Sequence, residues 1–206
     1  MRIDIRRLFD GSIAKGSANY IRIQRKYELA RTILFFVLSA SIFLIGFLST
    51  HSKRNLLTIV AVLGVLPAAK SFVSFIMFCK FKGCRQQLTD QLASLVKDCP
   101  LVHSFDRVFT TYDKNYEIEH LLVYQGDIIG FLDMYKAEKK DFDMEAFEKH
   151  IDSVLKAEGQ LNKKIYLLKE ESKYLKRVED IVNHMSSEYA PQSDMVVLKI
   201  LKDVSL

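Results

Sequence analysis

Residues 32–49, TILFFVLSASIFLIGFLS, and residues 56–79, LLTIVAVLGVLPAAKSFVSFIMFC, are the two stretches that decide the fold. Each is about long enough to cross a hydrocarbon core of ~30 Å as an α-helix, which rises ~1.5 Å per residue. The six residues between them, THSKRN, are polar and too few to form a domain. The sequence therefore predicts a transmembrane helical hairpin whose two ends lie on the same side of the membrane.

Two other interpretations of these stretches agree less well with the sequence. Helices in the core of a soluble protein seldom lack charged residues over eighteen positions, as residues 32–49 do. A cleaved signal peptide is also disfavoured, because 31 residues precede the first stretch and no small-x-small cleavage site follows it. We therefore expect both spans to remain in the mature protein.

The distribution of lysine and arginine indicates which side of the membrane the two ends occupy. Five of these residues lie between Lys15 and Arg31 and three between Lys80 and Arg85, whereas only two lie in the connection between the spans. Positively charged flanks are retained on the cytoplasmic side. We therefore expect a protein of the cell membrane with two spans and both termini cytoplasmic.

Charge also divides the chain into a basic and an acidic part. Residues 1–80 contain twelve Lys and Arg against three Asp and Glu, whereas residues 81–206 contain 18 against 22. The basic part favours a lipid bilayer with anionic headgroups, so the overall charge of +5 gives no support for nucleic acid binding. We expect a basic amphipathic segment at 1–31, a transmembrane hairpin at 32–80 and one cytoplasmic domain at 81–206.

Apolar residues recur at helical spacing before the first span, opposite a basic face. They are Tyr20, Ile23, Tyr27 and Ala30. This pattern predicts a helix that either lies in the headgroup layer or extends the first span.

Two residues of the second span are candidates for a function inside the membrane. Pro67 removes a backbone hydrogen bond and should kink the helix. Lys70 lies ten residues before Lys80, roughly 15 Å along a helix, and a charge at mid-membrane costs ~2.5–3.5 kcal/mol. Neither apolar stretch contains an acidic residue that could pair with Lys70. We therefore expect Lys70 to snorkel or to pack against a partner rather than to relay protons.

After the second span, the apolar pattern predicts a domain of mixed helices and strands. Helical spacing indicates helices over 85–98, 144–155 and 174–185, and apolar runs bounded by turn residues indicate strands over 106–112, 116–124, 127–135, 163–169 and 195–201. The order is α-β-β-β-α-β-α-β, and short connections make the first three strands an antiparallel meander. We therefore predict an α+β fold with a mixed sheet that carries helices on its faces.

The turn between the second and third strands leaves two registers open. A two-residue turn at Gln125 and Gly126 places Glu119 and Asp133 on different faces of the sheet, whereas a three-residue turn places them opposite each other. The second register gathers the better apolar face. We therefore prefer the three-residue turn.

Two segments of this meander carry a resemblance to a known family. Residues 116–123, YEIEHLLV, and 128–136, IIGFLDMYK, resemble the second and third strands of nuclease-related domains of the PD-(D/E)XK fold. The resemblance implies that Glu119 and Asp133 bind a divalent metal ion, with a lysine two positions after Asp133. This chain has tyrosine at that position, and Lys136 follows one place later, which in a strand is the opposite face.

Other signatures of catalysis are absent from the sequence, and we predict no cofactor. There is no phosphate-binding glycine loop, no nucleophile elbow and no HExxH motif. The spacing of Cys79, Cys84 and Cys99 matches no zinc pattern, so free thiols are expected. His120 has no histidine at ligand spacing, and we expect a hydrogen-bonded core residue.

The hairpin carries a second resemblance. Residues 56–60, LLTIV, followed by 65–70, VLPAAK, resemble uncharacterised two-span membrane proteins of Gram-positive anaerobes, which implies no activity. We therefore predict a membrane-anchored cytoplasmic interaction or regulatory module that is non-catalytic and binds a protein partner or forms a homo-oligomer. The alternative is a membrane-tethered, divalent-metal-dependent phosphodiesterase or nuclease-like enzyme that uses Glu119, Asp133 and Lys136.

Overall fold

A computed structural model describes residues 15–206, apart from 53–54, 98, 112–113, 134–141 and 187–188. The chain divides into two compact units. The described part of the first is Ile21–Lys82, which we call the hairpin unit. The second combines Ala14–Tyr20 with Gly83–Leu206, and we call it the α+β unit.

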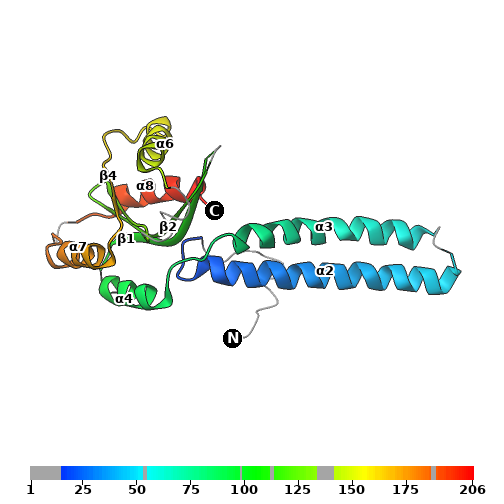
Figure 1. Ribbon diagram of the computed structural model, residues 1–206. Helices are drawn as coiled ribbons and strands as arrows, with labels where there is room; N and C mark the ends of the chain where they lie inside the picture. The colour runs from blue at the N-terminus through cyan, green and yellow to red at the C-terminus, as the bar shows by residue number, and fades with distance from the viewer. Residues whose placement is uncertain (1–14, 53–54, 98, 112–113, 134–141, 187–188) are drawn as a thin grey trace. The chain divides into compact units, whose positions relative to one another are not determined.

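The hairpin unit is built from two long helices, α2 (Tyr20–Thr50) and α3 (Leu56–Cys79) (Figure 1). Both are long and apolar enough to cross a membrane, as the sequence predicts. α2 is one continuous helix from Tyr20. The amphipathic residues before the first apolar stretch therefore extend the first apolar helix and do not form a separate helix. α3 also continues as one helix through Pro67.

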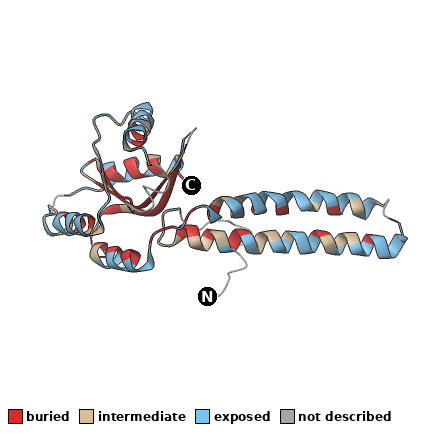
Figure 2. Ribbon diagram, viewed as in Figure 1, coloured by how far each residue is buried: buried red, intermediate tan, exposed pale blue. Residues whose placement is uncertain are grey.

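Most of the length of α2 and α3 is exposed or half-buried, with single buried positions between (Figure 2). Several of these buried positions are small residues, whereas many large apolar residues of both helices are exposed. Ala61, Ala68 and Ser71 of α3 are buried, and a Cβ atom at Gly64 would lie 2.6 Å from Ser39 Oγ. Small side chains permit this close approach of helices. Only 11% and 17% of the most apolar windows of α2 and α3 are buried, which is unlike the core helices of a soluble protein.

The turn end of the hairpin fixes the alignment of its helices. Asn55 donates from Nδ2 to the carbonyl oxygen of Gly46 over 2.9 Å, and its Oδ1 accepts from the Thr58 amide over 2.8 Å. A Cβ atom at Gly46 would lie 2.7 Å from Leu57 Cβ, so glycine is required there. Asn55 therefore caps α3 and bonds it to α2 at the same time.

The α+β unit contains a four-stranded mixed sheet in the order β1-β2-β3-β4 (Figure 1). Its elements are α4 (Gln86–Val96), β1 (Val102–Thr110), β2 (Asn115–Tyr124), β3 (Asp127–Phe131), α6 (Met144–Ala157), β4 (Ile165–Leu168), α7 (Glu171–Asn183) and α8 (Gln192–Asp203). Strands β1 to β3 are antiparallel, and β4 is parallel to β3. The predicted meander and mixed sheet are therefore confirmed.

Helices cover both faces of this sheet. On one face α6 and α8 pack on the strands through Phe147, Ile151, Leu155, Val197, Leu198 and Leu201. On the other face α4 and α7 pack through Leu88, Leu92, Val96, Tyr174, Val178 and Ile181. The residues of each helix in these sets recur every three or four positions. This is the periodicity that predicted α4, α6 and α7. The unit is thus a three-layer sandwich with one core on each side of the sheet.

The predicted strand at residues 195–201 is wrong, because this segment belongs to helix α8. Its apolar run also has helical periodicity. The buried residues of α8 are Asp194, Val197, Leu198 and Leu201. Met195 and Val196 between them are 55% and 49% exposed. A continuous apolar run of this length cannot distinguish a strand from a buried helix face without that pattern of exposure.

The preferred three-residue turn between β2 and β3 is also wrong. Tyr124 pairs directly with Asp127, which leaves only Gln125 and Gly126 in the turn. Their φ angles are +51° and +83°. Positive φ at both positions is the type I′ turn, whose twist matches that of hairpin strands. The structure therefore has the two-residue turn, the other register that the sequence left open, although glutamine is an uncommon residue at positive φ.

A side chain from α8 stabilises this turn. The Asp194 carboxylate accepts hydrogen bonds from the amides of Gln125 and Gly126, both over 2.8 Å, and from Tyr189 Oη over 2.7 Å. Asp194 is 0% exposed. The positive φ of Gln125 is therefore supported by a buried, hydrogen-bonded carboxylate far away in the sequence.

Side-chain alternation is interrupted in the middle of β2. Ile118 and Leu121 face the same core although they are three residues apart. In the neighbouring strand Asp106 has φ +51°, and the pairing passes from Phe105 with His120 to Arg107 with Ile118. Such irregularities redirect side chains. A strict alternation of faces therefore could not place Glu119.

Candidate functional site

Two buried carboxylates bind the backbone immediately before α4. Asp106 Oδ1 accepts from the Cys84 amide over 2.6 Å, and Glu117 Oε1 accepts from the Gly83 amide over 2.9 Å. Asp106 and Glu117 are only 1% and 2% exposed. Hydrogen bonds to charged acceptors are stronger than neutral ones. Both carboxylates therefore fix the conformation of the chain where it enters the α+β unit.

Arg85, the N-cap residue of α4, places a guanidinium near three further carboxylates. Its Nη2 lies 2.5 Å from Glu171 Oε2 and 3.7 Å from Asp133 Oδ2. Burial by itself lowers the pKa of Arg85, but Glu171, Asp133 and Glu119 outweigh it and raise that pKa above its usual value. The structure thus brings the candidate residues Glu119 and Asp133 near one cation that belongs to the chain itself.

The carboxylates around Arg85 do not fit a divalent metal site. One carboxylate oxygen each of Asp106 and Glu117 accepts a hydrogen bond from a backbone amide, and Asp133 lies near the Arg85 guanidinium. Within the described residues, no group of three His, Cys, Asp or Glu side chains could hold a metal ion. Lys136, the third residue of the nuclease-like alternative, lies outside the described residues.

His120 is a buried and hydrogen-bonded core residue, as predicted. Its Nδ1 lies 2.6 Å from Tyr174 Oη, and its Nε2 lies 3.2 Å from His103 Nδ1. Burial and, after it, the neighbouring His103 lower the pKa of His120 well below the usual value. Burial and then Lys202 lower the pKa of His103. These side chains therefore form a polar chain that is uncharged at neutral pH.

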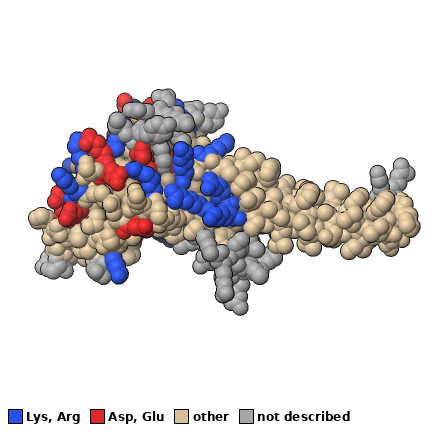
Figure 3. All heavy atoms as spheres, turned by 60° about the horizontal axis from the view of Figure 1, so that its bottom comes forward, with Lys and Arg blue, Asp and Glu red and all other residues tan. Residues whose placement is uncertain are grey.

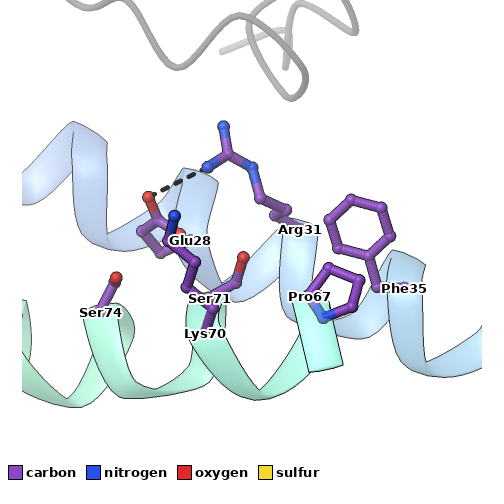
Figure 4. Close-up of a pocket in the computed structure, with 7 residues that line it drawn as sticks. All are labelled: Glu28, Arg31, Phe35, Pro67, Lys70, Ser71 and Ser74. Carbon is purple, nitrogen blue, oxygen red and sulfur yellow. Dashed lines mark hydrogen bonds and ion pairs between the residues drawn. The ribbon is translucent and has the colours of Figure 1, made fainter. Parts of the chain in front are cut away.

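A pocket of about 240 Å³ lies between α2 and α3 (Figure 4). The two membrane candidates of the sequence, Pro67 and Lys70, both line it. The charged and hydroxyl side chains around it are Glu28, Arg31, Lys70, Ser71 and Ser74. The structure therefore brings Lys70 together with two charged residues that precede the first apolar stretch.

Glu28 is the acidic residue that the apolar stretches lack. It is 6% exposed, and its Oε1 accepts from Gln24 Nε2 over 3.0 Å and pairs with Arg31 Nη1 at 3.3 Å. Glu28 precedes both apolar stretches, so the composition of those stretches alone does not predict it. The continuous amphipathic pattern that precedes residue 32 was the signal that could have found it.

Helix alignment also changes the depth expected for Lys70. Ser39 of α2 faces Gly64 of α3, and Arg31 lines the same pocket as Ser71. Lys70 is therefore level with the charged end of α2 and not with the middle of its apolar stretch. The nine residues of α3 after Lys70 run alongside the amphipathic segment of α2.

Comparisons with known proteins do not assign this site. No family model matches the chain, and no curated protein and no solved structure matches it. The two resemblances noted in the sequence therefore rest on their quoted motifs, and function has to be argued from the carboxylate cluster and the interhelical pocket.

Proposed function

We propose that this chain is a membrane-anchored interaction or regulatory module that performs no catalysis. Helices α2 and α3 anchor it in the cell membrane, both termini lie on the cytoplasmic side, and the α+β unit binds a protein partner there. An anchor of this kind concentrates a binding unit at one membrane surface. The proposal is supported by three features of the described residues.

The first supporting feature is the surface of the helical hairpin. Figure 3 shows a hairpin face without Lys, Arg, Asp or Glu along most of its length. In α2 the charged residues lie between Arg22 and Arg31, at the end away from the turn, and α3 contains one, Lys70. Side chains such as Leu48 and Leu66 are 68% and 64% exposed. Contiguous exposed apolar surface of this extent favours lipid as the solvent.

The second and decisive feature is Arg85. In a metal-dependent phosphodiesterase, carboxylates at a sheet edge neutralise a bound cation that activates water. Here Asp133 and Glu119 are near a guanidinium that is part of the fold. Arg85 supplies charge balance but no exchangeable coordination position. This observation favours a binding module over the nuclease-like alternative.

The third feature is a pair of adjacent apolar side chains on α8. Met195 and Val196 are 55% and 49% exposed, while the opposite side of the same helix is buried in the core. Methionine is enriched at protein interfaces relative to the rest of a protein surface. We assign the protein contact of the α+β unit to this face.

The absence of catalysis is tested with the purified full-length chain in detergent. Hydrolysis of a chromogenic phosphodiester is measured with magnesium or manganese, and metal binding is measured by calorimetry. We expect neither turnover nor binding heat. Metal-dependent turnover that is lost in Asp133→Ala and retained in Asp90→Ala, an exposed control, would establish the enzyme instead.

Partner binding is tested by chemical cross-linking of the full-length chain in its native membranes. We expect one stable complex, either with another protein or with a second copy. The double change Met195→Asp and Val196→Asp should abolish it, whereas Lys176→Asp on the exposed side of α7, at the other face of the sheet, should not. A chain that is monomeric and never cross-linked contradicts the proposal.

The topology is tested by protease access. We expect cleavage near Lys80 in inverted vesicles and not in intact cells. Cleavage near Lys80 in intact cells would contradict the topology.

A further inference from the structure

We infer that the pocket between α2 and α3 binds the anionic phosphodiester headgroup of a phospholipid, with Lys70 as its principal contact. The inference rests on the proposed membrane anchoring of α2 and α3. It assigns a ligand to a pocket that the proposed partner contact does not use.

The net charge of the side chains that line the pocket favours binding of an anion. Glu28 is already engaged by Arg31 and by Gln24. Lys70 forms no ion pair with any residue that the structure describes. The three charged side chains of the pocket therefore leave one net positive charge, carried at Lys70. A single negative charge of the phosphodiester class balances it.

The shape and the polar groups of the pocket suit a headgroup of several atoms. The volume of about 240 Å³ far exceeds the roughly 15 Å³ that one water molecule requires. Hydroxyls of Ser71 and Ser74 line the same space as the Lys70 and Arg31 side chains (Figure 4). Ser71 is 4% exposed, so its side chain is fixed at the helix contact. Hydroxyl, ammonium and guanidinium groups are the side-chain donors that bind phosphate oxygens.

The depth of the pocket agrees with a headgroup. Lys70 is level with Arg31, where the charged segment of α2 meets its apolar stretch. Phospholipid phosphates lie at the corresponding boundary of a bilayer, outside the hydrocarbon core. A lysine at that level can reach a phosphate without carrying its charge to mid-membrane.

An apolar stripe beside Lys70 favours a lipid over free phosphate. Leu66, Leu63 and Ile59 follow Lys70 toward the turn at spacings of three and four residues, so they lie on its face of α3. They are 64%, 59% and 59% exposed. An acyl chain can run along this stripe while its headgroup occupies the pocket. Inorganic phosphate would gain nothing from these side chains.

The inference is tested by lipid titration of the full-length chain in neutral detergent. Phosphatidylglycerol, phosphatidylcholine and inorganic phosphate are each titrated, and thermal stabilisation of the helices is recorded. We expect saturable stabilisation with phosphatidylglycerol, a weaker effect with phosphatidylcholine and none with inorganic phosphate. Equal stabilisation by inorganic phosphate would mean a free-anion site and would overturn the lipid assignment.

Matched variants localise the effect. Lys70→Leu should weaken phosphatidylglycerol binding roughly tenfold, since it removes a charge-assisted hydrogen bond to the phosphate, worth about 1.4 kcal/mol. Lys70→Arg should retain binding. Lys80→Leu, which removes the same charge outside the pocket, should change it less than twofold. Equal losses in Lys70→Leu and Lys80→Leu would reduce the effect to general surface charge and overturn the site.

A labelling measurement on the unaltered chain covers the case in which Lys70→Leu fails to fold. Amine-reactive labelling of Lys70 should slow severalfold in phosphatidylglycerol micelles compared with phosphatidylcholine micelles, while labelling of Lys80 should change little. Equal labelling of Lys70 in both would overturn the inference. Alkaline carbonate extraction of native membranes tests the anchoring separately, because release of the chain would refute the anchor itself.

Discussion

Leucine has opposite surroundings in the two units of this molecule. In the α+β unit Leu88 and Leu92 are 1% and 0% exposed, whereas in the hairpin unit Leu48 and Leu66 are 68% and 64% exposed. In the middle of the hairpin the buried residues are small ones such as Ala61 and Ala68. The hydrophobic effect drives large apolar side chains away from water, so the outward-facing leucines agree with the lipid surroundings proposed for α2 and α3.

The largest effect expected from this contrast is the loss of a buried leucine. Leu92→Ala should lower the free energy of unfolding of the α+β unit by about 2–5 kcal/mol, because it removes transfer energy and leaves a cavity. Leu63→Ala, at a position 59% exposed, should leave that transition unchanged. Urea unfolding of the full chain in detergent measures both. A similar loss in the two variants would contradict the assignment of different solvents.

The next effect compares the two turns, each of which depends on one polar side chain. Asp194→Ala should destabilise the α+β unit by about 3 kcal/mol, because the amides of Gln125 and Gly126 lose a charged acceptor. Asn55→Ala should cost the hairpin only about 1 kcal/mol, the usual contribution of an N-cap. Urea unfolding measures the effect of Asp194→Ala, and loss of helix in denaturing detergent measures the effect of Asn55→Ala. A larger effect of Asn55→Ala would reverse this order.

A smaller effect is expected from pH, and only in the α+β unit. The pKa values of His120 and His103 are lowered in the folded state, chiefly by burial. The unfolded chain therefore binds more protons, so stability is full above about pH 6.5 and falls below it by up to ~1.4 kcal/mol per histidine per pH unit. The urea midpoint between pH 7.5 and 5.5 measures this. His120→Asn should flatten the dependence, and His51→Gln in the α2–α3 turn should not.

The smallest effect is expected at the surface of α6. Lys149 Nζ lies 2.6 Å from Glu145 Oε1, although the two side chains are 75% and 79% exposed. Such exposed pairs contribute little to stability. Glu145→Ala should therefore leave the urea midpoint unchanged within error. A clear shift would show that short surface contacts matter more here than burial does.

The features that the sequence predicted were those determined by local pattern. Unbroken apolar stretches predicted α2 and α3, and helical spacing over 144–155 predicted α6, which begins after its N-cap Asp143. Gly159, with φ +74°, follows the end of that helix. In each case the deciding residues lie within a few positions of the feature.

The features that the sequence missed depend on contacts between distant residues. The β2–β3 turn is stabilised by Asp194, 69 positions after Gln125. The charge near Asp133 comes from Arg85, which also bonds to Glu171, 86 positions away. Contacts between residues so far apart in the chain produce no repeating pattern that a single sequence could show. The candidate carboxylates could therefore be found, but not the cation beside them.

The two carboxylates at the start of the α+β unit have a mechanical consequence. Gly83 and Cys84 follow Lys82 directly, and their amides bond to Glu117 of β2 and Asp106 of β1. A pulling force transmitted along the chain from α3 meets these bonds at once, with no slack segment to absorb it. The load then passes into the paired strands β1 and β2. Tension on the hairpin is therefore borne by the sheet and not by a linker.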